Sequence, residues 1–217
     1  MTEFWEAAFI EKQEMWGFEP ADSAIATKDL FLEKGVKNVL IPGIGYGRNA
    51  RIFHDNGMAV TAIEISRTAI DLAKTHFGDD IHIHHGSVTD MPFDMRLYDG
   101  IYCFALIHLL DEIERKALIA NCFAQLAPGG YMIFVTISKK APMYQKGIRI
   151  SPDRYETLPG VKIFFYDAES VRQEFGAYGL LDCAEIVDQG NQAKDAQPLE
   201  FLMIRCKKDD PLSTQAM

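Results

Sequence analysis

The chain has 217 residues, 48 % of them hydrophobic, which is long enough for one domain with a sizeable core. Its formal net charge is −9, from 22 basic and 31 acidic residues, and such a surface repels nucleic-acid backbones and anionic lipid. The N-terminus lacks a basic leader, and no apolar run approaches the roughly 20 residues of a membrane span, so we expect neither an export signal nor an anchor.

The cysteines indicate a reduced protein. The four of them are far apart and form no C-x-x-C pair, which is typical of small buried side chains rather than of a disulfide framework. We therefore expect a cytoplasmic location. The absence of repeats, linkers and low-complexity segments predicts a single domain over residues 1–217, which begins with a helical segment at 1–34.

Strand and helix patterns then alternate along the chain. Apolar or β-branched runs predict five strands, at 36–41, 59–65, 81–85, 100–106 and 131–137. Segments of helical period separate most of them, at 49–56, 66–76 and 112–126, with Ser66 as the N-cap of the second. This alternation predicts a parallel sheet, because parallel strands need crossover connections.

The last third of the chain departs from the alternation. Residues 139–166 are rich in proline, glycine, tyrosine and charge without a clean period, and a loop of that length is usually a lid or binding loop over the active site. A helix at 169–178 follows. Two final runs, at 181–187 and 199–206, flank a turn-rich stretch at 188–198 and predict an antiparallel hairpin at the edge of the sheet.

The sequence VLIPGIGYGRNA, at 39–50, places three glycines at alternate positions behind the first strand. A strand, a glycine turn and a helix start bring backbone N–H groups close to a ligand, as in nucleotide sites. A dinucleotide fingerprint requires its third glycine at position 48, where this chain has the bulky Arg48. The spacing fits an adenosyl sulfonium, which has no pyrophosphate, better than a nicotinamide dinucleotide.

Glu64 ends the second predicted strand, at the same edge of the sheet as the glycine loop. A carboxylate in this position can accept hydrogen bonds from both hydroxyls of a ribose. The alternative is a solvated carboxylate at the end of a strand. Taken together with the glycine loop, Glu64 is better explained as a ribose ligand.

Five motifs, in this order, resemble the class I, seven-stranded S-adenosylmethionine-dependent methyltransferases. They are PGIGYG, the acidic Glu64, HGSVTDMPFD, YDGIYCFALIHLL and LAPGGYMIFV, and the resemblance extends from about Val36 to Cys206. It implies an α/β, three-layer Rossmann-like sandwich: a mostly parallel seven-stranded sheet with an antiparallel last strand. It also implies S-adenosylmethionine as cofactor, S-adenosylhomocysteine as product, and the cofactor-binding positions Gly43, Ile44, Gly45, Gly47, Glu64, Ile65, Ser87, Val88, Phe104 and Ala105.

Two positions depart from the family pattern. Many members carry an acid two residues before the first glycine, where this chain has Ile41 followed by Pro42. The common Gly-Asp that holds the adenine amino group is here Gly86-Ser87, so the Ser87 hydroxyl or the Val88 backbone has to serve. The cofactor class is unaffected, but the contacts to the methionine amino group and to the adenine must differ.

Methyl transfer from a sulfonium depends mainly on placement of the two reactants, so no general base is obligatory. If a base is used, His108 is the candidate, because it follows the fourth strand at its carboxyl end and an ordinary histidine pKa of about 6.5 suits proton uptake. The alternative is that His108 only packs or caps the following helix. We expect no metal site, since alternation sends His82 and His84 to one strand face and His85 to the other.

The acceptor is expected to be a small molecule. The acidic charge disfavours nucleic acid, and FALIHLL stands where base-modifying members carry an Asn-Pro-Pro-aromatic motif. No G-x-S-x-G motif indicates a hydrolase. The N-terminal segment and the long insertion offer aromatic walls and one cation for the substrate: Trp16, Tyr144, Arg149, Tyr155 and Tyr166. The proline-containing loop and upstream tryptophans look somewhat like the thiopurine and thiol methyltransferase branch.

Three functions are compatible with these motifs. A small-molecule methyltransferase agrees with most of them. A nicotinamide-dependent oxidoreductase on a similar sheet is the first alternative, and the position of the third glycine opposes it. A non-catalytic adenosyl-binding regulator is the second, and the aromatic insertion opposes it because a bare binding module needs no second pocket.

Overall fold

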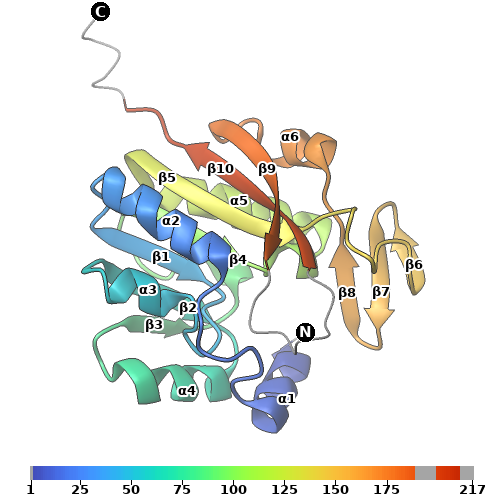
Figure 1. The fold of residues 1–217 in the computed structure, drawn as a ribbon, viewed down its shortest axis with the longest axis horizontal. Helices are drawn as coiled ribbons and strands as arrows, with labels where there is room; N and C mark the ends of the chain where they lie inside the picture. The colour runs from blue at the N-terminus through green and yellow to red at the C-terminus, as the bar shows by residue number, and fades with distance from the viewer. Residues whose placement is uncertain (1, 189–198, 211–217) are drawn as a thin grey trace, which may run out of the picture.

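A computed structural model describes residues 2–188 and 199–210. Its main sheet has seven strands in the order β3-β2-β1-β4-β5-β10-β9 (Figure 1). The strands are β1 (Asn38–Pro42), β2 (Ala59–Glu64), β3 (His82–His85), β4 (Tyr98–Phe104), β5 (Leu126–Ile137), β9 (Leu180–Asp188) and β10 (Leu199–Lys207). All seven predicted strands are confirmed, and the central ones, β1, β2, β4 and β5, carry the buried apolar runs that marked them in the sequence.

Strand direction also follows the prediction. β1 to β5 pair in parallel, whereas β10 runs antiparallel to β5 and to β9. β10 therefore lies inside the sheet and β9 forms its edge. The turn predicted at 188–198 lies, apart from residue 188 at the end of β9, outside the described residues.

Helices cover both faces of the sheet and give three layers (Figure 1). The apolar cluster on one face includes Phe31, Phe53 and Phe77, and the cluster on the other includes Leu118 and Phe175. The first set comes from α2 (Asp22–Glu33), α3 (Ala50–His54) and α4 (Arg67–Phe77), and the second from α5 (Glu112–Gln125) and α6 (Ala168–Phe175). The sheet is thus buried from both sides, as parallel sheets are.

Local capping signals fix where the helices begin. Ser66 is the N-cap of α4, as predicted, and its hydroxyl accepts a hydrogen bond from the Ala69 N–H at 3.1 Å. Asp111 and Glu114 form a capping box at the start of α5. None of the helices in the described ranges has both the length and the apolar character that a membrane span requires.

The insertion at 139–166 contains more regular structure than a loop. It holds a three-stranded antiparallel meander of β6 (Ile148–Ser151), β7 (Arg154–Leu158) and β8 (Val161–Phe164). The strands are short, and tight Pro-Asp and Pro-Gly turns separate them, so they produce no long periodic signal. Tyr155 and Ile163 pack into the apolar cluster that also contains Phe31, Phe53 and Phe77.

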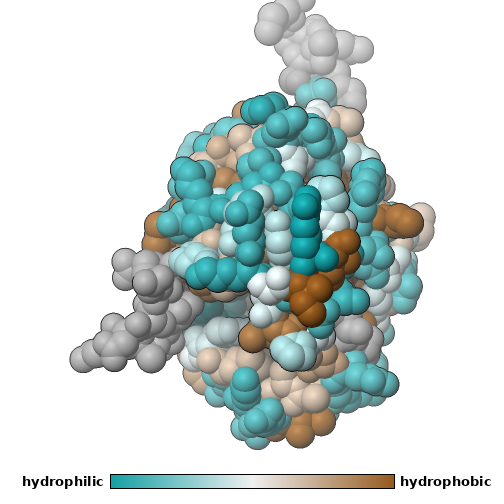
Figure 2. Space-filling view, turned by 90° about the vertical axis from the view of Figure 1, so that its right-hand side faces the viewer, coloured by the Kyte–Doolittle hydropathy of each residue, from teal (hydrophilic) through white to brown (hydrophobic). Residues whose placement is uncertain are grey.

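The N-terminal segment forms α1 (Thr2–Lys12) and α2, as predicted. α1 packs on α4, where the Glu6 carboxylate accepts hydrogen bonds from the hydroxyls of Ser66 (2.7 Å) and Thr68 (2.6 Å). The meander projects from the main sheet (Figure 1), on a mainly hydrophilic face that has a hydrophobic group near its middle (Figure 2). α1 and the meander are two additions to the sheet, and a cavity lies between them.

Candidate active site

The glycine loop joins β1 to α3 at the carboxyl edge of the sheet. All three glycines have positive φ, at 72° for Gly43, 58° for Gly45 and 91° for Gly47. A Cβ at Gly47 would come within 2.4 Å of the Phe77 ring, and one at Gly43 within 2.9 Å of Leu106. Only glycine combines a positive φ with the absence of a Cβ. The loop backbone can therefore lie close against α4 and the segment after β4.

Glu64 fixes this loop to the end of β2. Its carboxylate is 6 % exposed, and Oε2 accepts a hydrogen bond from the Gly45 N–H at 2.8 Å. Oε1 accepts from the N–H groups of Ile65 and Ser66, both at 2.9 Å. Burial raises the pKa of Glu64, and these N–H groups oppose the increase.

The donors and acceptors around the loop fit an adenosylmethionine. A carboxylate oxygen accepts two hydrogen bonds, so Oε2 of Glu64 retains one acceptor position for a ribose hydroxyl. Nη2 of Arg48, directly after the loop, is buried without a hydrogen-bond partner among the described residues. The carboxylate of a methionine moiety is the kind of acceptor that such a guanidinium binds.

The segment after β4 carries a strained residue. Ala105 has a φ of 53°, which non-glycine residues seldom adopt, while its N–H still donates to the Val135 carbonyl at 2.9 Å. Phe104 is half-buried and packs on Phe201, with 5.8 Å between ring centroids. Strained backbone of this kind clusters at functional sites, and here it lies at the strand end where the cofactor is expected.

Ser87 and Val88 also lie beside Glu64. The Gly86 N–H donates to the Glu64 carbonyl at 2.9 Å, which brings the end of β3 next to the end of β2. The Ser87 hydroxyl caps a short 3₁₀ turn and lies 2.7 Å from the Thr89 hydroxyl, while Val88 is buried. Because the Ser87 hydroxyl is already engaged, the backbone of this turn is better placed than the side chain to meet an adenine.

His108 lies in the 3₁₀ turn η2 (Ile107–Leu109) and is almost completely buried. Its Nδ1 accepts a hydrogen bond from the Ile137 N–H at 3.3 Å and lies 3.3 Å from the Thr136 hydroxyl. Burial lowers the pKa of His108 to about 3. His108 is thus a neutral, enclosed imidazole that accepts a hydrogen bond from the backbone of β5. This favours a packing role for His108 over a role as general base.

The depressed pKa of His108 predicts a pH dependence of stability. Between about pH 6.5 and pH 3 the unfolded chain binds a proton at this residue that the folded chain does not, so stability falls on acidification, by up to about 1.4 kcal/mol per pH unit. In urea unfolding at pH 7 and pH 5, we expect a His108→Asn variant to lose less stability than the wild type over this interval. Equal losses in the two proteins would contradict the depressed pKa.

The histidines of β3 adopt the predicted alternation. The rings of His82 and His84 meet on one strand face with centroids 4.4 Å apart. His84 also lies 3.3 Å from Asp94. Within the described ranges, no three His, Cys, Asp or Glu side chains are grouped as metal ligands.

The five residues predicted to contact the substrate do not converge on one pocket. Trp16 stacks on Tyr46 of the glycine loop, at 6.2 Å between centroids and an interplanar angle of 11°. Tyr144 packs against Tyr155 of β7, and Arg149 is exposed on β6. Tyr166 is fully buried in the other apolar cluster, where its hydroxyl donates to Glu174 at 2.6 Å, and this position is unsuitable for a pocket wall.

A cavity that no sequence motif indicated lies between α1 and the meander. It has a volume of about 240 Å³ and is lined by Phe4, Trp5, Leu109, Arg154, Gly160, Val161 and Lys162. Trp5 also contacts Phe9 and Trp16, both at 6.3 Å between centroids, and these rings pack around Tyr46 of the glycine loop. Trp5 thus links the cavity to the aromatic cluster on the glycine loop, and Leu109 links it to the segment after β4.

Comparison with known proteins agrees with this geometry. Residues 39–130 match the model of a family described as a methyltransferase domain. The ubiquinone biosynthesis O-methyltransferase of Coxiella burnetii is 30 % identical over 111 residues, which are 50 % of this chain and 47 % of that protein. A tRNA N(3)-cytidine methyltransferase of Danio rerio is 23 % identical over 185 residues, 80 % of this chain and 51 % of that protein. The chain thus spans about half the length of these curated relatives.

Solved structures share the fold across nearly the whole chain. The 1,6-didemethyltoxoflavin-N1-methyltransferase of Burkholderia thailandensis, with 1,6-didemethyltoxoflavin and S-adenosylhomocysteine bound, has a TM-score of 0.72 at 16 % identity and covers 96 % of this chain and 87 % of its own. A structure from echinomycin biosynthesis has a TM-score of 0.76 at 19 % identity and covers 99 % of this chain and 94 % of its own. The fold and the family match lead to the same conclusion: residues 39–130 match a methyltransferase domain, and the chain around them has the class I fold of the enzymes that use S-adenosylmethionine.

Proposed function

We propose that this protein transfers a methyl group from S-adenosylmethionine to a small molecule bound between α1, η2 and the meander. The observation that carries the proposal is the cavity of about 240 Å³, which shares Trp5 with the aromatic cluster on the glycine loop. Its size suits an acceptor that places a single ring in the cavity. A cytoplasmic location belongs to the same proposal and is supported by the four free cysteines.

The residues around the loop would hold the cofactor as follows. The backbone of Gly43, Ile44, Gly45 and Gly47 would lie along its methionine and ribose portions, and Glu64 would accept from a ribose hydroxyl. Ile65, Ser87 and Val88 would enclose the adenine. Phe104 and Ala105 would lie beside the sulfonium, whose positive charge an aromatic face and a backbone carbonyl both stabilise.

Catalysis in this arrangement depends on placement. When bound, S-adenosylmethionine would supply a methyl group on a sulfonium for in-line transfer, with the electrons of the breaking C–S bond left on sulfur and the proton of the acceptor passed to solvent. Holding the acceptor in attack geometry can contribute roughly 7–11 kcal/mol to lowering the barrier. Trp5 and Leu109 form the apolar wall of the cavity, and the buried His108 takes no part in the proton transfer in this proposal.

The relatives support small acceptors, with one exception. One is named for ubiquinone biosynthesis, and a structural neighbour binds 1,6-didemethyltoxoflavin. The relative that acts on tRNA makes a nucleic-acid acceptor the second candidate. The formal net charge of −9 opposes that candidate, because binding to a phosphate backbone depends on basic side chains.

Calorimetric titration with S-adenosylmethionine, S-adenosylhomocysteine and NADH under one set of conditions tests the proposal. We expect saturable binding of both adenosyl ligands and none of NADH, because Arg48 replaces the third glycine that the dinucleotide fingerprint requires. Release of S-adenosylhomocysteine from S-adenosylmethionine in the presence of small acceptors would then establish transfer. Binding of NADH alone would overturn the proposal, and turnover on tRNA but on no small molecule would favour the second candidate.

A further inference from the structure

The cavity between α1 and the meander contains two cations that no group in the described part of the chain neutralises. Arg154 of β7 and Lys162 of β8 both line it. Within the described ranges, neither side chain forms an ion pair, and Nε of Arg154 is buried without any hydrogen-bond partner. The Arg154 side chain as a whole is half-buried, but an enclosed guanidinium N–H without an acceptor is unfavourable unless a ligand supplies one.

The acids that attract these cations are already engaged elsewhere. Asp111 and Glu114 attract Arg154 but bond to each other's backbone N–H groups in the capping box of α5, at 2.8 and 2.9 Å. Glu156, opposite Lys162 in the meander, accepts from the Gly160 N–H at 2.8 Å. Burial lowers the pKa of Arg154, which is the opposite of what a bound carboxylate would cause.

The remaining walls of the cavity are apolar and aromatic. Phe4 and Trp5 meet edge to face, with centroids 5.2 Å apart, and Leu109 lies on the side of η2. The Phe4 ring would lie 3.8 Å from a Cβ on Gly160, which closes the cavity at the β7–β8 turn. A volume of about 240 Å³ is below the roughly 300–1,000 Å³ of sites for drug-sized ligands, so it admits a single ring.

We propose that the methyl acceptor is a single-ring aromatic compound with an anionic group, which Arg154 binds and Lys162 attracts. The ring lies against Trp5 and Leu109, and the reactive atom points toward the glycine loop. This inference rests on the proposed methyltransferase function and specifies its substrate class. A local pair of cations is needed because the protein as a whole, at −9, repels anions.

Binding of matched ring compounds to the protein saturated with S-adenosylhomocysteine tests the inference. Benzoate and benzamide have the same shape but differ in charge, and calorimetry gives both affinities. We expect benzoate to bind at least about tenfold more tightly than benzamide, as a charge-assisted hydrogen bond to a guanidinium provides. Phenyl phosphate shows which anionic group the acceptor carries. Tighter binding of phenyl phosphate than of benzoate indicates a phosphate, and weaker binding indicates a carboxylate.

Variants identify the cation. Arg154→Met should weaken benzoate binding by roughly ten- to a hundredfold and abolish the preference over benzamide, while Arg154→Lys should restore part of it. Lys162→Met should cause a smaller loss that disappears at high salt, because Lys162 is exposed. Arg172→Met, at an exposed arginine on α6, is the matched control and should change nothing.

The outcomes separate this inference from the proposed function. If S-adenosylhomocysteine does not bind, the methyltransferase proposal fails. If it binds equally to wild type and Arg154→Met, but benzoate binds no more tightly than benzamide or is unaffected by Arg154→Met, only the anionic acceptor is overturned. A loss of benzoate affinity in Arg149→Met and not in Arg154→Met would likewise overturn the assignment.

Discussion

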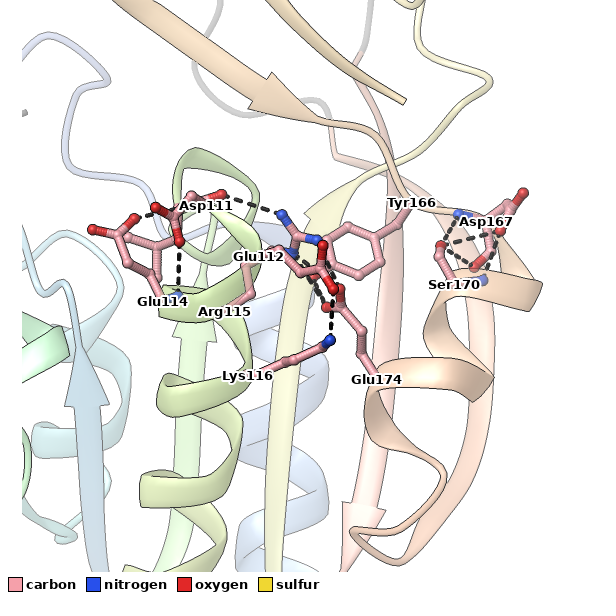
Figure 3. Close-up of polar contacts among 10 residues, drawn as sticks. Asp111, Glu112, Glu114, Arg115, Lys116, Tyr166, Asp167, Ser170 and Glu174 are labelled. Atoms are coloured by element: carbon pink, nitrogen blue, oxygen red, sulfur yellow. Dashed lines mark hydrogen bonds and ion pairs between the residues drawn. The ribbon is translucent and has the colours of Figure 1, made fainter. Parts of the chain in front are cut away.

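Glu174→Gln is expected to lower the free energy of unfolding by about 3–5 kcal/mol, because it leaves the Arg115 guanidinium buried without its counter-charge. Both side chains are almost inaccessible, at 4 % exposure for Arg115 and 9 % for Glu174, and Nη2 lies 2.8 Å from Oε1. The Tyr166 hydroxyl donates to the same carboxylate (Figure 3). The Phe164 ring lies 3.8 Å from the guanidinium carbon. Urea unfolding followed by tryptophan fluorescence measures the change.

The same helix provides the matched control. Glu112 and Lys116 form an ion pair at 2.6 Å whose side chains are 68 % and 61 % exposed, one turn from Arg115 (Figure 3). Glu112→Gln removes the same charge but should cost far less stability than Glu174→Gln, because water screens exposed pairs. Similar losses in the two variants would mean that the Arg115–Glu174 pair is less enclosed than the structure shows.

Glu64→Ala is expected to weaken binding of S-adenosylhomocysteine by about ten- to a hundredfold. Loss of one charge-assisted hydrogen bond to a ribose hydroxyl accounts for this range. The structure adds a second cause, since the N–H groups of Gly45, Ile65 and Ser66 all lose their acceptor and the glycine loop loses its link to β2. Calorimetry with S-adenosylhomocysteine at a temperature where both proteins are folded measures the loss.

The control for Glu64 is Asp79→Ala, which removes an exposed carboxylate from the turn after α4 and should leave the affinity unchanged. Glu64→Gln keeps one acceptor oxygen and should retain more affinity than alanine, which separates hydrogen bonding from a general loss of structure. An unchanged dissociation constant in Glu64→Ala would refute the ribose assignment.

The sequence by itself determined the sheet and the loop that the cofactor requires. Strands such as β1 and β5 are marked by apolar runs, the start of α4 by Ser66, and the loop by glycines whose positive φ no other residue tolerates well. These signals are local: each depends on residues that are neighbours in the chain. The same is true of Glu64, whose place at the end of β2 follows from the length of the strand.

Only the tertiary structure decided which residues line the cavity between α1 and the meander. Phe4 and Trp5 meet Arg154 there, although about 150 residues separate them in the chain, and no local pattern encodes such a contact. Tyr166 and His108 have types that suit a site, yet the packing of the core buries both. Side-chain chemistry is readable from the sequence, but whether a side chain lines a cavity or fills the core depends on distant segments that pack against it.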